Sequence, residues 1–194
     1  MRGSETRLAP LGSESRNVGS PSSASLLLPS EDEYPTEARY VYETLVAFGA
    51  PLLGWSSRRQ MSLEKALPRA LRLARADATL LRVLPLVLAR NSTGLDSAEL
   101  KKAAQLSAQE AALGFLLELT ADLAGKPSLG RLATLFEHAR NQEPTYFFEP
   151  RGERDRKLMQ LRTPEVARRW GFFLNMPKDD FSSLLKKHLA PVQH

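Results

Sequence analysis

Histidine and acidic residues are the side chains of this sequence best suited to acid–base or metal chemistry. Only three histidines occur, His138, His188 and His194, and none has a second histidine at metal-ligand spacing. The dipole at a helix C-terminus favours a nearby histidine, which explains His138 and His188 without catalysis. The acidic runs 31–33 and 179–180 are explained as solvated charge or as partners of a helix N-terminus. We therefore expect no catalytic residue and no metal site.

The sequence also lacks the short motifs that identify common enzymes. It contains no glycine-rich phosphate loop, no GxSxG nucleophile turn and no helical zinc motif. It contains no cysteine, which excludes disulfides, thiolate zinc sites and thiol nucleophiles. We expect a protein that is not an enzyme and binds no cofactor.

One segment combines the residue types that dominate protein–protein interfaces. Arg168 and Arg169 are followed by Trp170, Phe172 and Phe173. Arginine and large aromatic residues are enriched at binding hot spots because they combine buried area with directed hydrogen bonds. This segment is the best candidate for contact with a partner protein. In the alternative interpretation, Trp170 and one phenylalanine close the core while the arginines face water.

A second set of basic residues suits an acidic partner or a nucleic acid backbone. Three arginines recur about once per helical turn and can follow a line of phosphates, although a solvated basic face is the simpler explanation and is favoured. Three further bases lie nearer the C-terminus. The six candidates are Arg69, Arg72, Arg75, Arg162, Lys186 and Lys187.

The basic charge is concentrated in the C-terminal part of the chain. The formal net charge is +5 over 194 residues, and the surplus of bases over acids between Arg151 and Lys187 equals that whole excess. Such a balance attracts nucleic acid or an acidic protein surface but does not determine the fold. No apolar run approaches the length needed to cross a bilayer, and the run 26–28 is too short for a signal peptide. We expect a cytoplasmic protein.

The elements that must position these side chains are helices. Apolar residues recur at helical spacing through most of the chain, with Asp77, Asp96 and Ser107 as expected N-caps and Gly125 as an expected helix end. The segment 144–150 is bounded by prolines and is expected to be extended or loop-like. Because no alternating strands are visible, the sequence predicts an all-α protein, an irregular bundle of about seven helices.

The stretch from Leu95 to Leu119 has the spacing of a helix-turn-helix. Its second helix, however, contains acidic residues and no lysine or arginine up to Leu123, so phosphates would repel it. A packed helical hairpin is therefore favoured over a DNA reader.

The chain is expected to contain one folded domain. Residues 1–30 are rich in serine, glycine and proline and are predicted to be a disordered tail. Residues 31–194 are predicted to form a single helical domain with a basic C-terminal subregion from about residue 145.

Three segments carry a resemblance to known proteins: LARADATLLRVLPLVLARN, QEAALGFLLELTADLAGKPSL and TPEVARRWGFFLNMPKDDFSSLLKK. Together they span about Leu67 to Lys187. The chain resembles helical partner or antitoxin-like proteins associated with bacterial abortive-infection-type nucleotidyltransferase toxins. Antitoxins of that broader type commonly carry a winged DNA-binding module. The acidic second helix of the Leu95–Leu119 segment does not fit such a module. The resemblance implies a protein that binds such an enzyme.

The sequence therefore leads to two functional hypotheses. In the first, a non-enzymatic helical protein binds and neutralises or regulates a partner protein, such as a nucleotidyltransferase toxin, in an antitoxin-like manner. In the second, the basic helical faces make the protein a nucleic-acid-binding transcriptional regulator, whose affinity should fall steeply with salt.

Overall fold

The computed structural model describes residues 36–189, and the predicted tail, residues 1–30, lies outside them. The described part is mostly helical, as the sequence predicts, but it contains nine α-helices instead of about seven, with one 3-10 turn and one short strand pair. The helices are α1 (Thr36–Ala47), α2 (Leu63–Leu73), α3 (Ala78–Arg90), α4 (Ser97–Leu106), α5 (Glu110–Ala124), α6 (Pro127–Thr134), α7 (Glu153–Arg162), α8 (Glu165–Arg169) and α9 (Lys178–Leu189); the 3-10 turn η2 is Glu137–Ala139, and the strands are β1 (Thr145–Tyr146) and β2 (Phe172–Phe173).

Local capping determines several of the helix ends. The Asp77 carboxylate accepts hydrogen bonds from the backbone amides of Thr79 and Leu80, and Asp96 caps α4 in the same way. Gly125 ends α5 in the left-handed conformation that its missing Cβ permits. The predicted cap at Ser107 is wrong, because this residue is instead the C-cap of α4.

Two prolines lie inside continuous helices. Pro68 is within α2 and Pro85 is within α3. Because proline lacks a backbone N–H and clashes with the preceding turn, the sequence pattern predicts a kink or a restart at Pro68 and a bend or an early end at Pro85. Both helices continue past the proline, α2 to Leu73 and α3 to Arg90, so the restart and the early end are wrong.

The elements that the sequence does not reveal are α7 and the strand pair. Helix α7 is strongly polar and buries only Met159, so it has no apolar stripe to mark it. Strands β1 and β2 are parallel, with Thr145 opposite Phe172 and Tyr146 opposite Phe173. Two-residue strands are too short to show an alternating pattern, and their pairing depends on contacts between distant parts of the chain.

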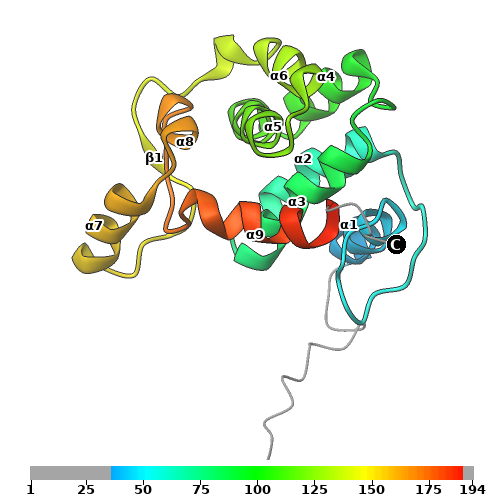
Figure 1. Ribbon diagram of the computed structural model, residues 1–194, viewed down its shortest axis with the longest axis horizontal. Helices are drawn as coiled ribbons and strands as arrows, with labels where there is room; N and C mark the ends of the chain where they lie inside the picture. The colour runs from blue at the N-terminus through cyan, green and yellow to red at the C-terminus, as the bar shows by residue number, and fades with distance from the viewer. Residues whose placement is uncertain (1–35, 190–194) are drawn as a thin grey trace, which may run out of the picture.

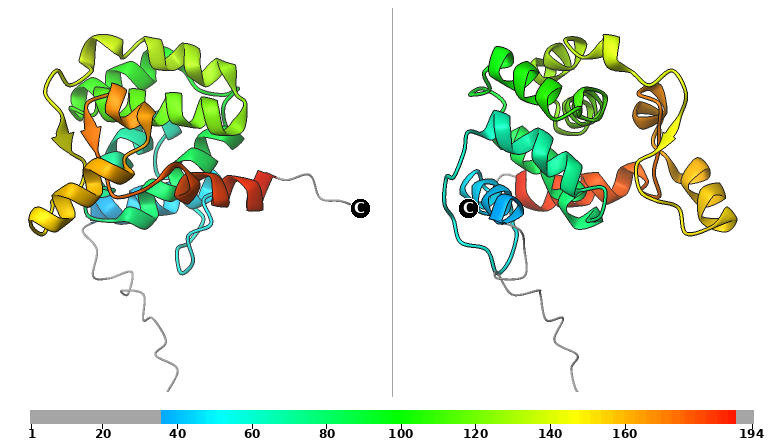
Figure 2. Two further views of the ribbon diagram at one scale, coloured as in Figure 1. Left: turned by 60° about the vertical axis from the view of Figure 1, so that its left-hand side comes forward. Right: turned by 180° about the vertical axis from the view of Figure 1, so that it is seen from behind.

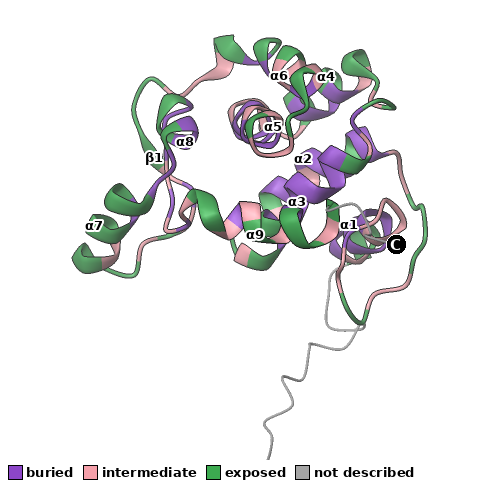
Figure 3. Cartoon of the chain, viewed as in Figure 1, coloured by how far each residue is buried: buried purple, intermediate pink, exposed green. Residues whose placement is uncertain are grey.

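Helices α3 and α5 form the centre of the molecule. Nine of the ten residues of α3 from Leu80 to Ala89 are buried, and α5 buries most of its residues from Ala112 to Thr120. A helix that is apolar on all sides must be covered on all sides. Helices α2, α6, α8 and α9 pack against this pair, whereas α7 projects from the body (Figures 1, 2 and 3). No helix among residues 36–189 is both long and apolar enough to cross a membrane.

A buried carboxylate attaches the loop between α1 and α2 to α1. The Glu43 side chain is almost fully buried and accepts hydrogen bonds from Arg39, Ser56 and Gln60. Burial opposes its ionisation, but the hydrogen bonds from Gln60, Ser56 and Arg39 and the charge of Arg39 outweigh burial and lower the pKa of Glu43.

This lowered pKa predicts acid sensitivity. In the unfolded chain Glu43 has an ordinary pKa of about 4.3, so its contribution to stability is complete above that value. The contribution is lost as the pH falls through the lower pKa of the folded state. We expect Glu43→Gln to reduce the free energy of unfolding at neutral pH by about 1–3 kcal/mol and to reduce its decline on acidification.

Denaturant unfolding of both proteins between about pH 7 and pH 3 measures this difference. Glu143→Gln is the control, because Glu143 is exposed. Parallel pH profiles for the wild type and Glu43→Gln would contradict the assigned role of Glu43.

Candidate functional site

The basic and aromatic segment predicted to contact a partner is largely an internal element. Trp170 is 0% exposed and Phe172 is 2% exposed. The indole Nε1 of Trp170 donates a hydrogen bond to the Glu118 carboxylate of α5 at 2.5 Å, and its ring lies against Gly114. Trp170 and Phe172 are therefore core residues. The expectation that they contact a partner directly is corrected for this conformation. Sequence alone cannot distinguish the two roles, because core and hot-spot aromatics have the same composition.

The remaining members of that segment also have partners within the chain. Arg168 donates to the backbone carbonyls of Thr163 and Gln160 at the end of α7. Arg169 forms ion pairs with Glu118 and with Glu165. Its hydrogen bond to Glu118 outweighs burial and raises the pKa of Arg169. These arginines attach α8 to its neighbours.

Phe173 is half-buried, and its ring centroid lies 5.6 Å from that of Tyr146. The ring contact therefore joins β2 to β1. Of the five residues predicted as a partner surface, Arg168, Arg169 and Phe173 keep some exposure, and each is already used in packing or pairing within the chain.

The three regularly spaced arginines, Arg69 and Arg72 in α2 and Arg75 in the turn after it, do not act as one row. Arg69 and Arg72 both pair with Glu37 in the first turn of α1, at 3.5 and 2.9 Å. The Arg75 guanidinium instead lies over the Phe147 ring, 4.7 Å from its centroid. One acidic residue, far away in sequence, therefore neutralises part of the predicted basic face.

The other predicted bases lie on separate elements. Arg162 ends α7 and donates to the Asn175 side chain at 3.1 Å, and Lys186 and Lys187 are exposed on α9. The structure thus distributes the six candidates over α2, the turn after α2, α7 and α9 instead of assembling them into one continuous surface.

The suspected helix-turn-helix, α4 and α5, is a packed hairpin. The would-be recognition helix α5 is the central helix of the core, and its residues Leu113, Phe115 and Leu116 are fully buried. A helix covered by its neighbours cannot enter a major groove without unfolding the protein.

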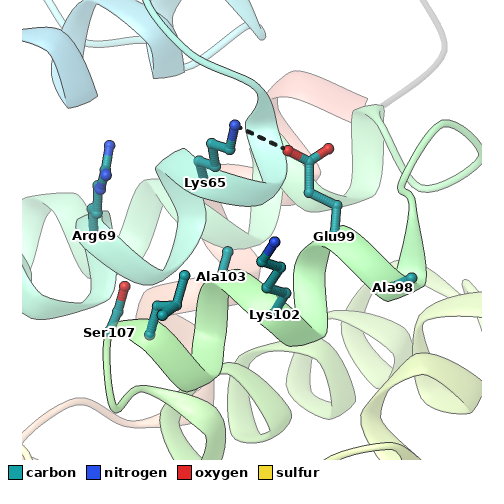
Figure 4. Close-up of a pocket in the computed structure, with 8 residues that line it drawn as sticks. Lys65, Arg69, Ala98, Glu99, Lys102, Ala103 and Ser107 are labelled. Carbon is teal, nitrogen blue, oxygen red and sulfur yellow. Dashed lines mark ion pairs between the residues drawn. The ribbon is translucent and has the colours of Figure 1, made fainter.

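A groove between α2 and α4 combines a concave shape with apolar and basic side chains (Figure 4). Its volume is about 440 Å³. Ala98, Ala103 and Leu106 contribute apolar surface on the α4 side, and Leu106 is 80% exposed. Such an exposed leucine beside a concavity differs from an isolated surface leucine, because it extends an apolar surface that a second molecule can cover.

Basic side chains border this groove. Lys65 and Arg69 extend from α2 and Lys102 extends from α4. The acidic residue lining the groove is Glu99, whose carboxylate lies 3.4 Å from the Lys65 ammonium. The groove lining therefore has three bases and one acid around an apolar centre. We define these residues, with Ala98, Ala103, Leu106 and Ser107, as the α2–α4 groove.

Sequence reasoning did not find this groove, although one signal was present. In α4 the buried residues Leu100, Ala103 and Ala104 lie on one helical face, and Leu106 falls outside that face when placed at 100° per residue. A leucine off the apolar stripe marks a surface position. The position of Leu106 opposite Lys65 and Arg69 depends on the packing of α2 against α4.

Neither metal-ligand geometry in the described residues nor similarity to known proteins assigns a further function. Within residues 36–189 no group of three or more His, Asp or Glu side chains is placed to hold a metal ion. Comparisons with models of protein families, with curated proteins and with solved structures found no match to this chain.

Proposed function

We propose that this protein is a non-catalytic, antitoxin-like binding protein that holds an acidic, partly apolar segment of a partner protein in the α2–α4 groove. The observation that carries the proposal is the exposed Leu106 in a concave surface bordered by Lys65, Arg69 and Lys102. Binding to this groove would neutralise or regulate the partner.

The apolar centre of the groove supplies the attraction. Covering Leu106 and the neighbouring alanines removes apolar surface from water, worth about 25 cal/mol for each Å² buried. A helical segment fits this role, because side chains at i, i+3 and i+4 present an apolar stripe to a groove between two helices.

The border of the groove determines the charge of the partner. Lys102 has no ion pair within residues 36–189, whereas Lys65 and Arg69 pair with the partly exposed Glu99 and Glu37. Carboxylates on both sides of an apolar stripe would meet this positive border, increase the association rate and select the orientation of the bound segment. A basic segment would be repelled.

The resemblance described above indicates which partner to test first. A nucleotidyltransferase toxin of the abortive-infection type is the first candidate. Its binding would make the protein antitoxin-like in the strict sense of neutralising an enzyme.

The predicted effect of altering the groove is loss of partner binding without loss of folding. Leu106→Ser changes an exposed residue, so stability should change by no more than about 0.5 kcal/mol. Affinity for the purified partner should fall by about 10-fold or more, because the apolar contact is replaced by an unpaired hydroxyl. Lys65→Glu/Lys102→Glu should reduce the association rate strongly and reverse its dependence on salt.

The test uses the full chain to capture a partner from its host after nuclease treatment, followed by reconstitution of the purified pair and titration calorimetry. Leu161→Ser is the matched apolar control, because Leu161 is 77% exposed on α7, away from the groove. Lys186→Glu/Lys187→Glu on α9 controls for overall charge. Equal affinity of groove and control variants for the reconstituted partner would reject the α2–α4 groove as its binding site.

A further inference from the structure

A second concave surface lies between the projecting helix α7 and the start of α3. Its volume is about 790 Å³. Phe148, Leu158, Met159 and Met176 provide apolar surface, and Asn175 provides an amide. We call this surface the arginine basin, because four arginines line it: Arg75, Arg82, Arg151 and Arg154. It shares no lining residue with the α2–α4 groove.

Arg75 occupies an unusual electrostatic position in this basin. Its guanidinium is packed over the rings of Phe147 and Phe172, at 4.7 and 5.7 Å, and donates to the Phe147 carbonyl at 3.4 Å. No carboxylate pairs with it within residues 36–189. Partial burial without a compensating anion lowers the pKa of Arg75. Aromatic faces and one carbonyl offset part of that desolvation and hold the planar group in place.

The other arginines add charge at the open side. Arg151 lies just before α7 and Arg154 lies in its first turn. Both are exposed, and neither has an ion pair in the described part of the chain. Arg82 lies 3.7 Å from Asp180 and is partly neutralised. Two acids, Glu149 and Asp155, also line the basin, and Asp155 accepts a hydrogen bond from the Arg151 backbone amide. The lining residues therefore retain an excess of positive charge.

We propose that the arginine basin binds a small organic phosphate of nucleotide size, with the phosphate between Arg75, Arg151 and Arg154 and the less polar part against Phe148 and Leu158. A guanidinium presents parallel N–H donors that match two phosphate oxygens. The volume is within the range of about 300–1,000 Å³ typical of small-molecule sites.

The distribution of basic residues favours a small ligand over a nucleic acid strand. A strand requires a track of cations that follows successive phosphates. Here Arg69 and Arg72 pair with Glu37, and Lys186 and Lys187 lie on α9. The unpaired arginines instead line one concavity, in which a single phosphate can contact several of them.

Equilibrium dialysis of the full chain measures its binding of ATP, AMP, adenosine, inorganic phosphate and a single-stranded oligonucleotide. We expect ATP and AMP to bind and adenosine to bind at least about 10-fold more weakly, since adenosine lacks the phosphate that makes the charge-assisted contacts. Inorganic phosphate should compete with AMP. Arg151→Ala/Arg154→Ala should weaken AMP binding at least about 10-fold, and both positions are exposed, so folding should be preserved.

Two further variants separate specific binding from general charge. Lys186→Ala/Lys187→Ala removes the same formal charge from α9 and should leave AMP binding unchanged. Arg75→Lys retains the positive charge but removes the planar guanidinium with its parallel N–H donors, so it should weaken AMP binding. Thermal unfolding of the variant checks that it is folded. The proposal is overturned if ATP and AMP do not bind at millimolar concentration, if the α7 and α9 double variants behave alike, or if only single-stranded oligonucleotides bind.

Discussion

Replacing Trp170 with alanine is expected to reduce the free energy of unfolding by about 3–5 kcal/mol, a large part of the stability of a domain of this size. The side chain is fully buried, so its removal leaves a cavity that the surrounding helices fill only in part. The Nε1 hydrogen bond to Glu118 is lost as well, and the Arg140 guanidinium, 4.9 Å from the ring, loses its aromatic partner.

Urea denaturation followed by circular dichroism measures this loss. The other tryptophan provides the control: Trp55 is only half-buried and stacks on Tyr42 at 4.5 Å, so Trp55→Ala should cost less than Trp170→Ala. Trp55→Phe leaves Trp170 as the single tryptophan, whose emission should be blue-shifted by its apolar surroundings. If Trp170→Ala lost less stability than Trp55→Ala, Trp170 would belong to a surface and the original partner-contact hypothesis would regain support.

Replacing Gly114 with alanine is expected to destabilise the protein by about 3 kcal/mol, the upper end of the usual overpacking range. A Cβ built on Gly114 lies 2.1 Å from the nearest atom of the Trp170 ring and within 2.8 Å of two others. The obstacle is a rigid aromatic ring in the core, so α5 or α8 must move. On an exposed helix the same substitution would be stabilising by about 0.5–1 kcal/mol.

Gly130→Ala in α6 is the matched control. Its added Cβ would lie 3.6 Å from the Ala121 Cβ, an ordinary contact, so the favourable helical preference of alanine should prevail. A double-mutant cycle with Gly114→Ala and Trp170→Phe, measured by urea denaturation, tests the contact directly. We expect the two changes to be strongly non-additive, since they alter the same packed space. Independent effects would show that Gly114 and Trp170 are not in contact.

Helices with local signals could be predicted from the sequence, and those without such signals could not. Asp77 and Asp96 cap their helices through bonds to amides two and three residues ahead, which is information within a single turn. Helix α7 buries only Met159, so its helical state leaves little mark in the apolar pattern. The parallel pairing of Thr145 with Phe172 joins residues that are far apart in the sequence, so no local pattern specifies it.

The candidate site was predicted less well, because chemical type does not specify exposure. Arg69 and Arg72 were recognised as a basic face, but Glu37 had to be brought beside them by the packing of α1 on α2. Leu106, at the turn of the suspected helix-turn-helix, was not recognised as a binding residue, and it is one of the most exposed leucines of the described chain. The α2–α4 groove needs both helices in place before it exists.

The sequence by itself determined that this protein is largely helical and where many of its helices begin and end, because caps and apolar periodicity act over one or two turns. Only the tertiary structure decided which functional-looking residues remain available for binding. Trp170 became a core residue because Gly114 makes space for its ring and Glu118, far away in the sequence, satisfies its N–H group. Burial and ion pairing are properties of neighbours in space, and these neighbours are assigned only when the helices pack.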